Sequence, residues 1–110
     1  MPKPERNALR VPDEAVEQLC EAFLALRDGE ECRCFFRDLL TPQELSTLAQ
    51  RLQVARMLCE GCTYDRIRAQ IATSSCTITR ISTELQYGSG GYRMVLARLA
   101  RTDETEEEKE

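Results

Sequence analysis

The sequence has no histidine and no tryptophan, and its 110 residues include only three phenylalanines and three tyrosines. Without histidine the chain lacks the usual base of a catalytic triad and the commonest metal ligand. No apolar run approaches the roughly 18 residues that a membrane span needs. Residues 1–11 lack the apolar segment of a secretory signal. We therefore expect a cytoplasmic protein that is not an enzyme, does not enter a membrane and uses no cofactor.

Glycine and proline are also scarce, with five and four residues, whereas leucine, alanine, glutamate and arginine are abundant. This composition and the spacing of the apolar residues predict an all-α fold with about six helices in residues 13–101. Residues 1–12 hold three of the four prolines and are expected to form a flexible arm. Residues 102–110 carry six acids and one base, and are expected to be a disordered acidic tail.

Apolar side chains recur at helical spacing in successive segments of the chain. The stripes are Val16, Leu19, Cys20, Phe23 and Leu24; Cys32, Phe35, Phe36, Leu39 and Leu40; Leu45, Leu48, Ala49, Leu52, Ala55 and Cys59; Ile67 and Ile71; Ile78, Ile81 and Leu85; and Tyr92, Val95, Leu96 and Leu99. We expect Gly29 to end the first helix and Gly61 to end the third. Thr41-Pro42-Gln43-Glu44 predicts a capping box at the third helix start, and Thr63 is the expected N-cap of the fourth.

The net charge of −4 is unevenly distributed. Residues 1–50 sum to −4 and residues 102–110 to −5, whereas residues 51–101 carry eight bases and three acids, a net charge of +5. A basic segment is the electrostatic footprint expected of a nucleic-acid-binding protein. An ordinary solvated helical surface would explain the same distribution.

The six cysteines are expected to be reduced and structural. Two pairs, Cys59 with Cys62 and Cys32 with Cys34, have spacings that metal sites use. Because Cys20 and Cys32 fall on apolar stripes, we predict no metal site. A thiol-based metal or redox sensor remains the alternative.

Residues 63–85 have the pattern of a helix-turn-helix, with two helices joined by a short turn at residues 72–75. The second helix begins with small residues that bear donors, as a helix entering a major groove requires. The predicted DNA-binding residues are Arg66, Arg68, Ser74, Ser75, Cys76, Thr77 and Thr79. The pattern alone leaves open a purely structural hairpin.

Several segments resemble a known family. Leu40-Thr41-Pro42, Arg51, Gly61 and Thr77-Ile78-Thr79-Arg80 stand at the spacing seen in the Trp repressor. Residues 49–58, together with Tyr87-Gly88 and Gly91-Tyr92, are still more similar to the YerC/YecD family of Trp-repressor-like proteins. The resemblance covers about residues 15–100. It implies an intertwined homodimer with one helix-turn-helix in each subunit, which binds double-stranded DNA as a transcriptional regulator.

The same resemblance implies a pocket for a small effector. Arg51 and Arg80 match the two arginines that grip tryptophan in the Trp repressor, and Thr41 belongs to the same predicted pocket. The repressor has glycine after its second arginine, where this chain has Ile81, so we expect tryptophan not to bind in that way. The arginines would then pair with Glu84 or Glu44, or bind another small anion.

The sequence thus favours a DNA-binding regulator that does not respond to tryptophan. Asp65, Arg68, Ser75 and Cys76 stand where the repressor has its basic and small residues, so the operator is expected to differ. A protein-interaction or small-anion-binding dimer without DNA binding is the second hypothesis.

Overall fold

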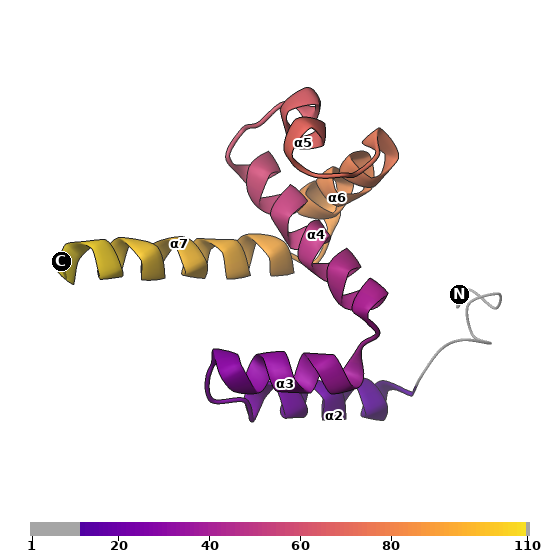
Figure 1. Cartoon of the computed structure of the whole chain (residues 1–110), viewed down its shortest axis with the longest axis vertical. Coiled ribbons are helices and arrows are strands. Elements are labelled where there is room, and N and C mark those ends of the chain that lie inside the picture. Colours follow the sequence, from indigo (N-terminus) through magenta and orange to yellow (C-terminus); the bar gives the residue numbers. More distant parts are fainter. Residues whose placement is uncertain (1–11, 110) are drawn as a thin grey trace. The chain divides into compact units, whose positions relative to one another are not determined.

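The computed structural model describes residues 12–109, with side chains up to Thr102, and this part of the chain is entirely helical between its turns (Figure 1). Its six helices are α2 (Asp13–Leu24), α3 (Gly29–Leu39), α4 (Pro42–Cys59), α5 (Tyr64–Gln70), α6 (Ser75–Tyr87) and α7 (Gly91–Lys109). They fall into two compact units, one with α2 and α3 and the other with α4 to α7. The all-α prediction with about six helices is confirmed.

The first unit is a helical hairpin held by an aromatic cluster. The Phe23 ring meets Phe35 and Phe36 edge to face, with centroids 5.7 and 6.0 Å apart. Asp28 caps α3 by accepting a hydrogen bond from the Glu31 backbone N–H at 2.9 Å. Gly29 is therefore the first residue of α3 rather than the end of the preceding helix, because the aspartate before it supplies the N-cap. No residue of either helix is buried.

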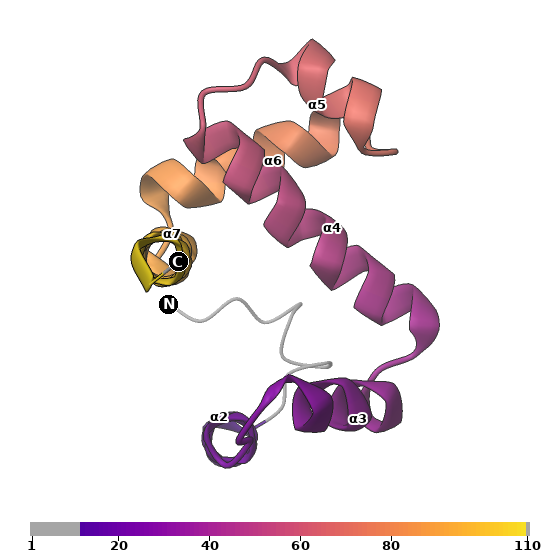
Figure 2. The same cartoon turned by 60° about the vertical axis from the view of Figure 1, so that its left-hand side comes forward.

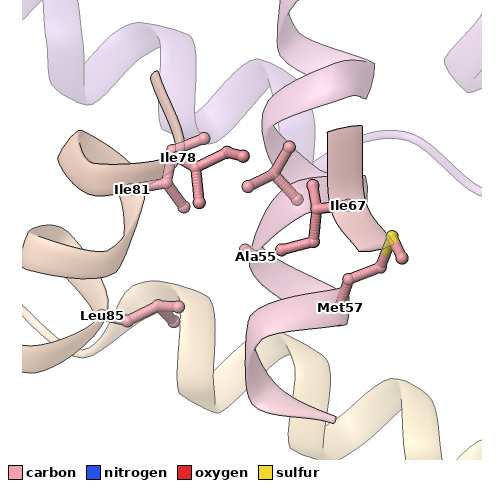
Figure 3. Close-up of a cluster of buried hydrophobic side chains, with 7 residues drawn as sticks. Ala55, Met57, Ile67, Ile78, Ile81 and Leu85 are labelled. Atoms are coloured by element: carbon pink, nitrogen blue, oxygen red, sulfur yellow. The ribbon is translucent and has the colours of Figure 1, made fainter. Parts of the chain in front are cut away.

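The second unit has the hydrophobic core, which draws on α4, α5 and α6 (Figure 3). Its buried members are Val54, Ala55, Met57, Ile67, Ile78, Ile81 and Leu85. The three residues predicted to face inward from α6 are confirmed. On α4 only Ala55 of the predicted stripe is buried within the single chain, Leu45 and Leu52 are half-buried, and Leu48 is 47% exposed. Apolar side chains lie on more than one side of α4, and α5 and α6 cover only the side that carries Val54 and Met57.

The turn after α4 confirms the expected role of Gly61. Its backbone is left-handed, with φ of +85°. The Cys62 N–H donates to the Met57 carbonyl and the Gly61 N–H to the Leu58 carbonyl, both at 3.0 Å. This pair of bonds is a Schellman motif, in which glycine avoids the steric penalty of positive φ. It ends α4 and turns the chain into α5.

Gly88 ends α6 at a place with no room for a side chain. A Cβ atom there would lie 2.4 Å from the Glu84 carbonyl oxygen. After the turn, the Arg93 guanidinium reaches back from α7 and its Nε donates to the Leu85 carbonyl at 2.9 Å. The turn between α6 and α7 is therefore fixed both by the lack of space at Gly88 and by the hydrogen bond from Arg93.

Gly88→Ala is expected to lower the free energy of unfolding by about 1–3 kcal/mol, as overpacking does. The measurement is urea unfolding at fixed protein concentration. Gly91→Ala is the matched control, because a Cβ there meets nothing within 4 Å. Equal effects of the two alanines would contradict the steric account.

Helix α7 extends to Lys109, so the prediction of a disordered tail from residue 102 is corrected: the backbone there is helical. Glutamate and lysine are good helix formers, and the Thr102 hydroxyl donates to the Arg98 carbonyl at 3.0 Å. The predicted arm at residues 1–12 lies outside the described residues except for Pro12, which precedes α2.

Candidate nucleic-acid interface

Helices α5 and α6 form two capped helices joined by a four-residue link, Ile71–Ser74 (Figure 2). Thr63 caps α5, as predicted, by accepting from the Arg66 N–H at 3.2 Å. Ser74 caps α6 by accepting from the Thr77 N–H at 3.1 Å. Each cap satisfies a backbone donor that a helix start would otherwise leave unpaired. The start of each helix is therefore set by its own sequence.

The inner side of this helix pair is apolar and the outer side is polar. Ile67 of α5 and Ile78 of α6 are fully buried, at 0% exposure, and join both helices to α4. The Gln50 side chain of α4 also donates to the Ala72 carbonyl in the link at 2.8 Å. These contacts fix the link against α4.

The predicted DNA-binding residues gather on the outer side and at the start of α6. Six of the seven are exposed, and Thr77 is half-buried. The exposed six are Arg66, Arg68, Ser74, Ser75, Cys76 and Thr79. A surface of hydroxyls and guanidinium groups can donate to phosphate oxygens and base edges.

Arg68 joins the two helices by a polar bridge that sequence analysis missed. One guanidinium nitrogen donates to Ser75 Oγ and another to Asp65 Oδ1. Because arginine has five N–H donors, this leaves donors for a further acceptor. Asp65 therefore orients Arg68 and also places a negative charge beside it.

Tyr64 is a second residue that sequence analysis missed. It is the first residue of α5, is half-buried and packs against the core. Thr79 Oγ1 donates to its phenolic oxygen at 3.3 Å. The only sequence signal was an aromatic residue directly after the N-cap Thr63, and that signal does not specify a partner on another helix.

The residues of the predicted effector pocket differ in solvent exposure. Arg51 on α4 and Arg80 on α6 are exposed, whereas Ile81 is 4% exposed and belongs to the core. Thr41 is the residue before α4, in the first unit. Among the described residues no ion pair joins Arg80 to Glu84, which was one of the predicted partnerships.

The six cysteines are all free thiols. Cys62 is half-buried against the core, whereas Cys59 at the end of α4 is exposed. The described part of the chain has no group of three or more histidine, cysteine, aspartate or glutamate side chains placed to hold a metal ion. Nor is any described helix both long and apolar enough to cross a membrane.

Two short capped helices on an apolar base, with donors concentrated at the start of the second, are the arrangement of helix-turn-helix proteins. A model of the family described as Trp repressor protein matches residues 14–100. The chain therefore belongs to the Trp repressor family.

Relatives place the chain more narrowly. It is 47% identical over 88 residues to the uncharacterized protein YerC of Bacillus subtilis, covering 80% of this chain and 85% of YerC. A crystal structure of a TrpR-like protein from Eubacterium eligens matches with a TM-score of 0.77 and 42% identity, over 86% of this chain and 95% of that one. A Staphylococcus aureus protein described as a candidate Trp repressor matches with a TM-score of 0.76 and 41% identity, over 86% of this chain and 93% of that one. The chain is a YerC-like member of the family.

Proposed function

We propose that this protein is a homodimeric transcriptional regulator that binds specific sites in double-stranded DNA through α5 and α6. The observation that carries the proposal is the exposed set of hydroxyl and guanidinium groups around the start of α6, above a fully buried Ile67–Ile78 base. The start of α6 also presents the positive end of its dipole, which favours phosphate. Residues 51–101 carry a net charge of +5, which also favours the binding of phosphate.

The proposed dimer rests on apolar surface that one chain leaves uncovered. On the α2–α3 hairpin the exposed apolar side chains are Val16, Leu19, Phe23, Leu24 and Leu39. The α4–α7 unit exposes Leu48, Met94, Val95 and Leu99. Exposed apolar patches on a protein surface commonly mark sites of interaction with another chain. A second copy that interleaves its helices with these would cover both sets.

A two-fold axis would give the protein a symmetric operator. In helix-turn-helix dimers the two recognition helices lie about 34 Å apart, one turn of B-DNA. Each α6 would then enter successive major grooves on one side of the duplex. We therefore propose an operator of two inverted half-sites.

Tryptophan is not the proposed effector. Ile81 is buried in the core, and its side chain occupies the position where the resemblance requires glycine. The exposed Arg51 and Arg80 remain available for another small anion, whose identity would come from screening.

A genomic selection tests the proposal. Purified protein is mixed with sheared DNA of its source at about 0.1 M salt, and the retained fragments are sequenced. An inverted-repeat motif, with affinity falling by roughly 0.9 log units in K per contacted phosphate for each log unit of salt, supports the proposal. No enrichment, with or without added metabolite extract, would contradict it and favour a dimer that binds other proteins or anions.

Arg68→Ala is expected to weaken binding by a similar factor for all DNA sequences and to flatten the salt slope by about one unit. The reason is the loss of one guanidinium that can meet a phosphate. Arg98→Ala on α7 is the control, because it changes the net charge equally outside α5 and α6. An unchanged slope for Arg68→Ala would remove this residue from the interface.

Asp65→Asn complements that variant. Asparagine keeps an oxygen that can accept from Arg68 but removes the charge that repels phosphate. We expect affinity to rise by about two- to fivefold at low salt, the scale of one exposed charge interaction. A fall in affinity would mean that the full charge of Asp65 is needed to hold Arg68 in place.

A further inference from the structure

Tyr64 of α5 and Thr79 of α6 form a hydroxyl pair that joins the two helices. The tyrosine is held by its ring, which packs against the core, and its phenolic oxygen accepts from Thr79 Oγ1 at 3.3 Å. Thr79 is exposed on α6, and Thr83 one turn later donates to the Thr79 backbone carbonyl at 3.0 Å. The pair therefore links a fixed residue of α5 to an exposed residue of α6.

The bond changes what Thr79 can offer to DNA. The Thr79 and Tyr64 hydroxyls share one hydrogen bond at 3.3 Å, so the Thr79 hydroxyl is held toward Tyr64. Because threonine is β-branched, fixing the hydroxyl also fixes the methyl group on the same carbon. What this leaves for contact with DNA is a methyl group in one defined position.

The Tyr64 hydroxyl can form a second hydrogen bond. Among the described residues, Thr79 is the one partner of its oxygen. A phosphate oxygen is a suitable acceptor, since hydroxyl donors commonly position DNA-binding proteins on the backbone.

We propose that Tyr64 sets the base preference of α6 by holding the Thr79 methyl against a thymine methyl while its own hydroxyl donates to a phosphate. This rests on the proposed function, because it requires α6 to lie in a major groove. Contact with the thymine C5-methyl is one of the few apolar ways of reading a base pair there. The preferred half-site would contain one thymine whose methyl group is needed.

The test uses duplexes selected by the wild-type protein from a random-sequence pool, in which each thymine is replaced in turn by deoxyuridine. This deletes one methyl group and keeps base pairing. For the wild type we expect one position in each half-site where the replacement weakens binding about fourfold, as expected for losing one buried methyl group. Thr79→Ser should lose this discrimination because it deletes the methyl group, and Thr79→Val should weaken it because it deletes the hydroxyl that bonds Tyr64.

Tyr64→Phe keeps the packed ring and removes the hydroxyl. We expect its discrimination between thymine and deoxyuridine to fall below twofold, together with a uniform loss of affinity. Tyr87→Phe is the matched control, because Tyr87 lies at the far end of α6 and is 80% exposed; it should bind as the wild type does. Thermal unfolding should be unchanged for both variants.

The possible failures are distinct. If the wild type selects no duplex, the proposed function fails and this inference fails with it. If the wild type selects a site but no thymine methyl matters, or Tyr64→Phe discriminates as well as the wild type, only the role of Tyr64 is overturned. If Tyr64→Phe loses affinity uniformly but still discriminates thymine from deoxyuridine, Tyr64 contacts only the DNA backbone, and its role in base preference is overturned.

Discussion

Replacing Ile67 by alanine is expected to lower the free energy of unfolding of the α4–α7 unit by about 3–4 kcal/mol. Ile67 is fully buried, and truncating such a side chain loses transfer free energy and leaves a cavity, for a typical cost of roughly 2–5 kcal/mol. Total stability is usually only about 5–15 kcal/mol, so one substitution would remove a large part of it. Helix α5 has only seven residues, and Ile67 is its one buried side chain.

Urea unfolding followed by circular dichroism would measure this loss, at one protein concentration for all variants because dimer stability depends on concentration. Ile71→Ala is the control, since Ile71 is only half-buried in the link after α5 and should cost less. DNA affinity at a temperature where Ile67→Ala is still folded would report whether loosening α5 also misplaces α6. A loss below about 1 kcal/mol would show that Ile67 is not central to this core.

Replacing Phe23 by aspartate is expected to dissociate the proposed dimer and to weaken binding to a two-half-site operator by about a hundredfold or more. Phe23 is 43% exposed in the single chain and is the ring shared by both aromatic contacts of the hairpin. Burying an unpaired carboxylate at an apolar contact is strongly unfavourable. Without the dimer, the second half-site is no longer bound intramolecularly, and the gain from bivalency is lost.

Sedimentation velocity would measure the assembly, and titration of the selected duplex would measure the affinity. Gln18→Asp adds the same charge to α2 on the side opposite the apolar stripe and should remain dimeric. A dimeric Phe23→Asp protein, or a monomeric Gln18→Asp protein, would contradict the assignment of this face to the interface. A wild-type monomer would overturn the proposed dimer itself.

Local signals predicted local structure well. The N-cap at Thr63 and the helix end at Gly61 were predicted because a cap or a left-handed glycine acts within a few residues of the chain. The inward residues of α6 were predicted because one continuous apolar side leaves one choice of buried face. The family resemblance came from motifs of the same short range, and the match over residues 14–100 confirms the family.

Local signals also misled at two places. Gly29 has the composition of a helix end, yet Asp28 before it supplies the cap that makes it a helix start. The acidic segment after Arg101 has too few apolar residues to pack against a core. It is nevertheless helical, because its residues have high helix propensity and extend a helix that has already formed in α7.

What the sequence determined by itself is therefore the helices, most of their ends, the buried side of α6 and the family. The tertiary structure decided which side of α4 is covered, because Val54 and Leu48 both lie on apolar sides and only the packing of α5 and α6 selects between them. It also decided the partners of Arg68 and Thr79. Those contacts join side chains of different helices, and a hydrogen bond of about 3 Å depends on how the helices are placed against each other, which no spacing along the chain encodes.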